Sequence, residues 1–157
     1  MPVVGLVGGH AAAEIPASHL DLVDCPPVAA LTTLGRDGAP QTSVVWCDWD
    51  GDCVRVNTMR GFAKERNLRR DPRATLLCFD PRTPDRYLEV RGVVVEMTEA
   101  GAPAHLDALA SHYAGRPVRY FGDCIPASFE ATEVPVVCRI RPVHVVALDA
   151  RAARPAS

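Results

Sequence analysis

The segment from Val56 to Pro72, VNTMRGFAKERNLRRDP, decides the fold because it takes the chain from a strand into a short helix. Residues 53–57 alternate and are rich in β-branched side chains, which is the pattern of a half-buried strand. Gly61 breaks that pattern, and the helix-forming residues 63–70 end just before Pro72. We therefore expect a strand-to-helix corner around Gly61.

This corner has the features of an anion site. The first N–H groups of a helix have no partner within the helix, and the helix dipole is positive at this end. Thr58, Arg60 and Lys64 add a hydroxyl group and two cations. A Walker loop or a dinucleotide fingerprint needs two or three glycines where this segment has one. The residues are compatible with a phosphate pocket and equally with a basic helix face that is only solvated.

Composition places the chain among globular proteins. Its 157 residues are 48% hydrophobic and 23% charged, as expected for one domain. The formal net charge of −2 gives no sign of nucleic-acid binding. No apolar run approaches the roughly 20 residues needed to cross a bilayer, so no membrane partner is expected. Residues 1–14 are predicted to form a flexible leader and residues 151–157 a disordered tail.

The six cysteines lie far apart, without the C-x-x-C or cysteine-histidine spacing of a zinc site. Several lie in apolar runs, such as the one around Cys78, where a reduced cysteine behaves as a small hydrophobic residue. We therefore predict no metal site and a reducing, cytoplasmic location.

Hydrophobic alternation predicts a mainly β chain with a few helices. Asp37-Gly38 is a strong hairpin signal, and Asp50-Gly51 marks another tight turn. Six strands are expected, over residues 28–34, 41–49, 53–58, 73–79, 87–97 and 134–148. Gly92 is predicted to mark a bulge, and Pro142 a break or bulge in the last strand.

The region after the fifth strand is predicted to be helical and then irregular. Residues 99–114 have the spacing of a core-facing helix, with His105 and His112 expected at its surface. Residues 115–132 are the least regular part of the chain, and they are compatible with a connecting loop or with a lid.

Several short segments occur here in an order known from one family. They are LTTL at 31–34, DGAPQ at 37–41, VW at 45–46, VNT at 56–58, GFAKERNLRRDPR at 61–73 and LEVRG at 88–92. Together they resemble the pyridoxamine 5′-phosphate oxidase-like split-barrel family, and most of all its deazaflavin (coenzyme F420) oxidoreductases. The resemblance implies a six-stranded antiparallel split β-barrel of the FMN-binding type over residues 15–150. It also implies a homodimer with cofactor sites at the subunit interface.

The resemblance implies a set of cofactor-binding residues as well. Asn57, Thr58, Arg60 and Lys64 match the family's phosphate-binding corner, and Asn67 matches a residue that holds the corner together. The remaining matches are a strand along the ring system, a tryptophan near the ring, and two residues that close the site from the partner subunit. Gln41, Thr42 and Ser43 match the strand along the ring system, and Trp46 matches the tryptophan near the ring. Arg86 and Tyr87 match the two residues that close the site from the partner subunit.

The function implied is that of an oxidoreductase in which F420 carries a two-electron hydride transfer to a small unsaturated or quinone-like substrate. No catalytic side chain is predicted, because the sequence has no evident catalytic triad, H-E-x-x-H motif or paired carboxylates. The basic and polar C-terminal segment that holds the substrate of pyridoxamine phosphate oxidase is not found, so that activity is not expected.

Alternatives remain for the cofactor and for the activity. The arginines of residues 66–73 suit either the acidic tail of F420 or a solvated helix face, so FMN is the alternative cofactor. A flavin- or deazaflavin-binding protein without turnover is a second possibility. A haem protein is a third, and it would need His144 or His19 as the iron ligand.

Overall fold

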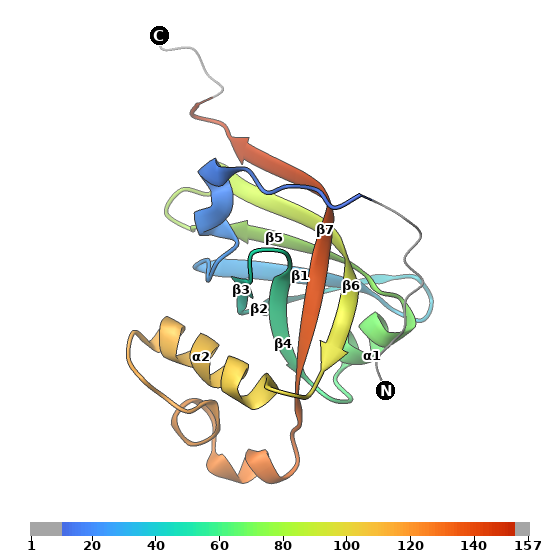
Figure 1. The fold of residues 1–157 in the computed structure, drawn as a ribbon, viewed down its shortest axis with the longest axis vertical. Helices are drawn as coiled ribbons and strands as arrows, with labels where there is room; N and C mark the ends of the chain where they lie inside the picture. Colours follow the sequence, from blue (N-terminus) through green and yellow to red (C-terminus); the bar gives the residue numbers. More distant parts are fainter. Residues whose placement is uncertain (1–10, 153–157) are drawn as a thin grey trace.

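The computed structural model describes residues 11–152. Most of the leader predicted for residues 1–14, and of the tail predicted for 151–157, lies outside this range. The helices and strands follow in the order η1 (Ala17–Leu22), β1 (Val28–Leu34), β2 (Pro40–Val45), β3 (Cys47–Trp49), β4 (Val54–Met59), α1 (Ala63–Arg70), β5 (Arg73–Phe79), β6 (Arg86–Thr98), α2 (Ala102–Ala114), η2 (Tyr120–Cys124), η3 (Ala127–Ala131) and β7 (Pro135–Asp149). The protein is mainly β, as the sequence predicts (Figure 1).

Within residues 11–152 the strands form one seven-stranded antiparallel sheet in the order β2-β1-β5-β6-β7-β4-β3. The count exceeds the predicted six because the strand expected over residues 41–49 is divided at Trp46. Its two parts, β2 and β3, lie at opposite ends of the strand order although they are neighbours in the sequence. The sheet therefore curls into a half-barrel, with Trp46 at the point where its two ends meet.

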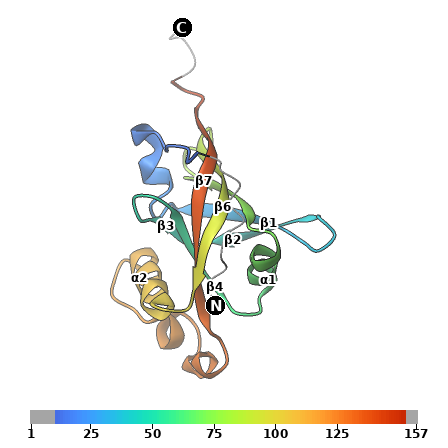
Figure 2. The ribbon, with the colours of Figure 1, turned by 45° about the vertical axis from the view of Figure 1, so that its right-hand side comes forward.

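The hairpin between β1 and β2 has the turn that the sequence predicts. Gly38 adopts a φ of +81°, which is open to glycine at little cost, and Asp37 Oδ1 accepts the N–H of Ala39 at 3.0 Å. The turn of this hairpin projects well past α1 (Figure 2). Edge strand β2 is consequently exposed along most of its length.

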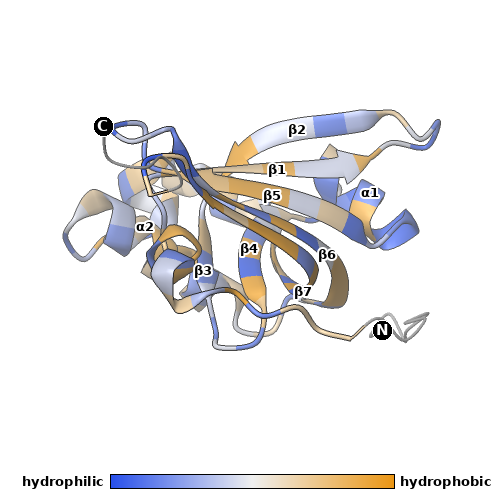
Figure 3. Ribbon diagram, turned by 90° about the horizontal axis from the view of Figure 1, so that it is seen from above, coloured by the Kyte–Doolittle hydropathy of each residue, from blue (hydrophilic) through white to orange (hydrophobic). Residues whose placement is uncertain are grey.

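The curled sheet encloses the main hydrophobic core. Inward-facing residues alternate with outward-facing ones, as in β1, where Ala29, Leu31 and Thr33 are buried. Leu76, Leu88, Val90 and Ile140 are among the largest fully buried side chains of this core. Hydrophobic residues are concentrated on the strands, whereas α1 is mostly hydrophilic (Figure 3). Its Leu68 is nonetheless 2% exposed and anchors the helix to the core.

Strands β6 and β7 are long, and they pair along most of their length. The register shifts between Arg91, which pairs with His144, and Gly92, which pairs with Pro142, so the extra residue is Val143 on β7. The bulge predicted near Pro142 is confirmed, and Gly92 lies opposite it. A Cβ atom at this glycine would lie 2.6 Å from Cγ2 of Ile140, so β7 passes too close for a side chain. Pro142 pairs with Gly92 at the bulge, and β7 continues through it without a break.

Helix α2 packs against β4 and β7 and closes a second, smaller cluster of Met59, Leu106 and Phe121. It lies between two glycines in the left-handed conformation, Gly101 and Gly115, which explains its ends. Residues 115–132 are not extended loop: they fold into η2 and η3 below α2 (Figure 1). No helix among residues 11–152 is long and apolar enough to cross a membrane.

Candidate functional site

A pocket of about 230 Å³ lies where Trp46, the end of β4 and the start of α1 meet α2. Its walls combine apolar, aromatic and polar side chains. They are Val44, Val45, Trp46, Asn57, Thr58, Met59, Phe62, Lys64, Leu106, Leu109 and Tyr120. Four of the predicted cofactor-binding residues are therefore brought together here, namely Trp46, Asn57, Thr58 and Lys64.

Lys64 supplies the positive charge of the pocket, and it is the single lysine in the 157 residues. Its side chain is half-buried, and burial lowers its pKa below the usual range. No ion pair to Lys64 is formed by the residues of the described part of the chain. A half-buried ammonium group without a carboxylate partner is a favourable place for an anion.

Two polar atoms of the pocket-lining residues are buried without a hydrogen-bond partner. They are Oδ1 of Asn57 and Oγ1 of Thr58, which come from consecutive positions of β4. A buried polar atom without a partner is costly, so such atoms in a native structure call for an explanation. A ligand with complementary hydrogen-bonding groups provides one.

The start of α1 differs from the expected open anion seat. Glu65 is buried, and its Oε2 accepts the N–H of Gly61 at 3.0 Å. Its other carboxylate oxygen accepts from Arg69, one turn further along the helix. One of the free N–H groups at the corner is thus already satisfied by the chain itself. Glu65 holds the turn in place, and an anion would depend mainly on Lys64 rather than on the helix end.

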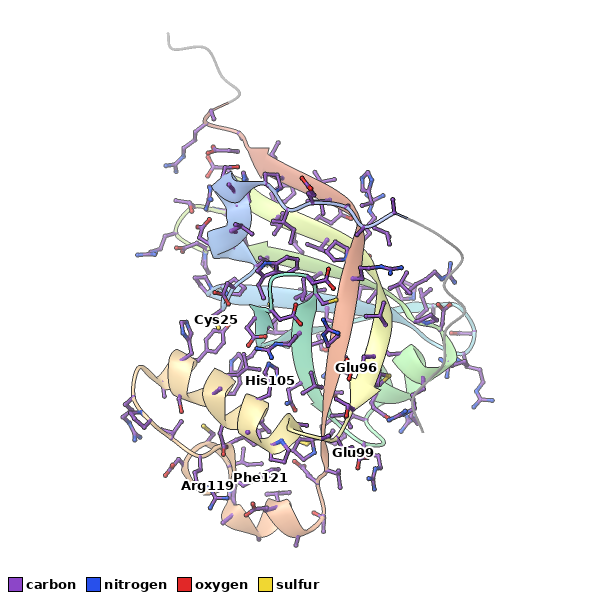
Figure 4. All side chains as sticks on the ribbon, viewed as in Figure 1. Cys25, Glu96, Glu99, His105, Arg119 and Phe121 are labelled. Carbon is purple, nitrogen blue, oxygen red and sulfur yellow. The ribbon has the colours of Figure 1, made fainter. Side chains whose placement is uncertain are left out.

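Arg60 lies outside the pocket walls. Its Nε donates to Oε1 of Glu99 at 2.6 Å, and both side chains are exposed. Glu99 lies just below the end of β6 (Figure 4). The second cation expected at the corner is therefore neutralised by an acidic residue 39 positions later in the chain.

The three residues expected along the ring system lie on edge strand β2, and none of them lines the pocket. Gln41 accepts a hydrogen bond from Nδ2 of Asn67 at 2.9 Å. The hydroxyl groups of Thr42 and Thr32 lie 2.8 Å apart across the β1–β2 pair, and Ser43 is half-buried. Asn67 also donates to Oγ1 of Thr33, so it joins α1 to both strands of the hairpin.

Trp46 forms an aromatic wall with two tyrosines. Its ring stacks on Tyr113 with 5.3 Å between centroids and 11° between planes. Tyr120 meets it edge-on, at 6.1 Å and 89°. Tyr120 comes from η2, so the irregular region after α2 contributes directly to the pocket.

Arg86 and Tyr87 lie at the start of β6, and neither lines the pocket of its own chain. Arg86 donates to both carboxylate oxygens of Asp21, at 2.9 and 2.7 Å, and to the carbonyl of Ser18. Tyr87 lines a separate surface hollow with Leu77, Phe79, Pro84 and Glu89. Within one chain these two residues are not part of the site.

His105 does not line the pocket, but it contacts a residue that does, Asn57, and the sequence did not reveal this. It is 8% exposed rather than at the surface, because it turns from α2 toward the sheet (Figure 4). Its Nε2 lies 3.1 Å from Oδ1 of Asp48, and its Nδ1 lies 3.2 Å from Nδ2 of Asn57. Helical spacing alone gives the face of a histidine and not its partners on β3 and β4.

Comparison with known proteins identifies the family. The model of the pyridoxamine 5′-phosphate oxidase family matches residues 15–151. The chain belongs to this family. Its half-barrel is accordingly the split-barrel fold, as the sequence predicts. No curated protein sequence matched the chain.

Three solved structures illustrate the range of this split-barrel fold. An F420 reductase is 29% identical, with a TM-score of 0.69, over 84% of this chain and 98% of that one. A conserved hypothetical protein from Mycobacterium tuberculosis is 27% identical, with a TM-score of 0.67, over 93% and 92% of the two chains. The haem storage protein HutZ from Vibrio cholerae is 16% identical, with a TM-score of 0.56, over 77% and 85%, and it shares the fold alone.

The pocket combines surfaces suited to a planar ring, to hydrogen bonds and to an anion. The aromatic wall and the apolar side chains suit a planar ring, while Asn57 and Thr58 offer unpartnered polar atoms. Lys64 suits a phosphate group. A second hollow, of about 570 Å³, is bordered by Arg36, Arg66, Asn67, Arg69 and Arg70, so α1 contributes residues to both hollows.

The cysteines add no further chemistry to the split barrel. No group of three potential metal ligands occurs among the residues that the structure describes. Burial raises the pKa of the Cys25 thiol to about 11 and that of Cys53 to about 11, so both are protonated at neutral pH. Neither of these two thiols is therefore a thiolate nucleophile, and no cysteine of the described residues lines the pocket.

Proposed function

We propose that this split-barrel protein is an oxidoreductase that uses F420 for two-electron hydride transfer to a small unsaturated or quinone-like substrate. The observation that carries the proposal is the pocket itself. One half-buried cation, two unpartnered polar atoms and an aromatic wall converge on it. The 29% identity to an F420 reductase over nearly that whole chain supports the choice of cofactor.

Each group of residues has a distinct task in this proposal. Lys64 binds the phosphate group, and Thr58 and Asn57 hydrogen-bond polar groups of the cofactor. Trp46 and Tyr120 cover the ring and exclude water, which strengthens every charged interaction in the site. The bound cofactor supplies the hydride chemistry, and the protein binds and orients it. This division of labour explains why no side chain is needed as nucleophile.

The arginine-lined hollow favours F420 over FMN. FMN ends in one phosphate group, whereas F420 continues from its phosphodiester into an acidic tail. Arg36 and the arginines of α1 that border the hollow are all exposed. Several of these guanidinium groups already donate within the chain, as Arg66 does to Gly61 O and Arg70 to Asn67 Oδ1. They keep further N–H donors for a carboxylate.

A homodimer would complete the site. The pocket opens beside the exposed side chains of Val44 and Phe62, which are 72% and 46% exposed. Apolar side chains at the mouth of a polar pocket favour coverage by a second subunit. Arg86 and Tyr87, which lie away from the pocket of their own chain, are then available to the pocket of the partner.

A haem protein is less well supported by the same geometry. His144 is exposed on β7. His19 is buried, and its Nε2 is 3.1 Å from the carbonyl oxygen of Leu148. Neither histidine lines the pocket, and the likeness to HutZ extends to the fold alone.

Paired titrations of the purified protein with F420 and with FMN test the proposal. Quenching of tryptophan emission reports binding, because Trp46 lies in the wall. We expect F420 to bind at least tenfold more tightly than FMN, and the reduced F420 complex to transfer hydride to quinone or enone acceptors. The reverse preference would make the protein an FMN enzyme. Tight F420 binding without turnover on any acceptor would leave a binding protein, and binding of neither would overturn the proposal.

A further inference from the structure

The amide group of Asn57 has only one orientation that the surrounding residues allow. Its Nδ2 lies 3.0 Å from the carbonyl oxygen of Ala102, and a backbone carbonyl can only accept a hydrogen bond. The amide nitrogen must therefore face α2. Its second N–H then points to Nδ1 of His105 at 3.2 Å, which has to be an acceptor. Both N–H groups are used, and Oδ1 is left without a partner.

The state of His105 follows from its other neighbour. Burial alone would raise the pKa of Asp48, but hydrogen bonds from His105 and Arg55 outweigh it and hold that pKa below the usual range. Arg55 donates to both oxygens of Asp48, at 2.8 and 2.6 Å. An ionised carboxylate only accepts, so Nε2 of His105 carries a proton. Nδ1 faces a donor, the amide nitrogen of Asn57, and therefore keeps its lone pair.

We propose that His105 is a positioning residue that fixes the amide group of Asn57, a residue of the pocket wall, with its buried oxygen free of any partner in the chain, so that the pocket selects ligands with an N–H or O–H donor at this point. The assignment rests on the proposed function for the identity of the ligand. A ligand with an acceptor there would face the lone pairs of Oδ1 and be rejected. Asp48 on β3 orients His105 on α2, and His105 in turn orients Asn57, so the specificity at Asn57 depends on both residues.

The groups that face His105 are Asp48 on β3 and Asn57 on β4, with Arg55 one step behind Asp48. If the amide of Asn57 turned, its oxygen would lie against the carbonyl oxygen of Ala102 and its nitrogen would lose both acceptors.

Three variants separate positioning from simple packing. His105→Leu removes both ring nitrogens, whereas His105→Asn retains an acceptor close to the position of Nδ1 and does not titrate. His112→Leu is the matched control, because His112 is an exposed histidine on the same helix. We expect about tenfold weaker F420 binding for His105→Leu. Affinities within about twofold of the native protein are expected for the other two.

Rescue by the asparagine variant gives a result that a purely structural role would not. A His105→Asn variant that binds F420 as weakly as His105→Leu would overturn the inference.

A measurement without ligand keeps this inference separable from the proposed function. Nitrogen-15 NMR of the native protein reports which nitrogen of His105 carries the proton. The Nε2–H form is expected, and the Nδ1–H form would overturn the inference even if F420 binds tightly. Binding of neither F420 nor FMN would overturn the proposed function, and the NMR result would then decide the orientation of Asn57 by itself.

Discussion

Nδ2 of Asn67 lies 2.9 Å from Oε1 of Gln41, so a buried side chain on α1 holds a side chain on exposed edge strand β2. The same nitrogen lies 3.0 Å from Oγ1 of Thr33, which is 1% exposed. The two contacts differ in burial, and this difference separates stability from ligand binding.

We expect Asn67→Ala to lower the free energy of unfolding by about 2–3 kcal/mol, because it leaves the buried hydroxyl of Thr33 without its partner. Gln41→Ala removes an exposed group and should cost less than about 1 kcal/mol. If Gln41 contacts the cofactor, as the family resemblance implies, its variant still binds F420 more weakly. Urea unfolding and F420 titration of both variants test this, and equal stability losses would contradict it.

The single lysine makes the anion site accessible to a clean test. Lys64→Met keeps the length of the side chain and removes its charge. We expect F420 affinity to fall about tenfold to hundredfold, since hydrogen bonds to charged groups contribute about 1.5–3 kcal/mol. Fluorescence titration measures the loss, and Arg60→Met serves as the comparison because Arg60 lies outside the pocket walls. An equal or larger loss for Arg60→Met would show that Arg60, and not Lys64, binds the anion.

Lys64 also predicts a pH dependence of stability in the absence of ligand. Burial lowers its pKa in the folded state, so the unfolded state binds the proton more strongly. Stability should therefore rise with pH between the lowered pKa and the usual value for lysine. Lys64→Met should abolish this rise and be no less stable than the native protein near neutral pH. Thermal unfolding in alkaline buffers measures this rise in stability. If stability rose in parallel in Lys64→Met, the rise would not come from Lys64.

Glu99 competes with any anion for Arg60. Glu99→Gln would release the guanidinium group, so we expect affinity for F420 to rise by up to about fivefold at low salt. The gain should vanish at high ionic strength because both side chains are exposed. Glu96→Gln is the matched control, since it removes one carboxylate from Arg139, which keeps its ion pair with Asp50. Unchanged affinity in Glu99→Gln would show that Arg60 does not reach the ligand.

The close approach at Gly92 predicts a large effect of a small substitution. Gly92→Ala would place Cβ 2.6 Å from Ile140 Cγ2 and 2.7 Å from the carbonyl oxygen of Arg141. A loss of about 3 kcal/mol is expected, because the backbone of β7 would have to move. Gly38→Ala is the comparison: it has open space but a φ of +81°, and should cost about 1 kcal/mol. Similar losses in urea unfolding would argue against a clash.

Local signals in the sequence were sufficient for most of the fold. The Asp37-Gly38 turn, the bulge near Pro142 and the end of α1 before Pro72 each depend on residues next to one another. The division of a strand at Trp46 does not. Alternation continues through residues 41–49 without glycine or proline, and the two halves separate only because they pair with β1 and β4.

The candidate site was predictable where neighbouring residues form it, as with Thr58 and Lys64. It was not predictable where distant residues meet. Glu65 has the appearance of a surface residue of a polar helix, yet it is 2% exposed and holds the N–H of Gly61. His105 depends on Asp48, 57 positions earlier. Helical periodicity carries no information about such partners.

The placement of Trp46 between β2 and β3 has a mechanical consequence. These two strands belong to opposite ends of the sheet, so the ten residues Pro40–Trp49 connect those ends and keep the half-barrel curled. The pocket is lined by residues of this connecting segment and by residues of α1 and α2. A molecule bound there would bridge parts of the chain that must separate when the sheet opens. Occupancy and resistance to unfolding would then rise together, by the mass-action relation between ligand concentration and affinity.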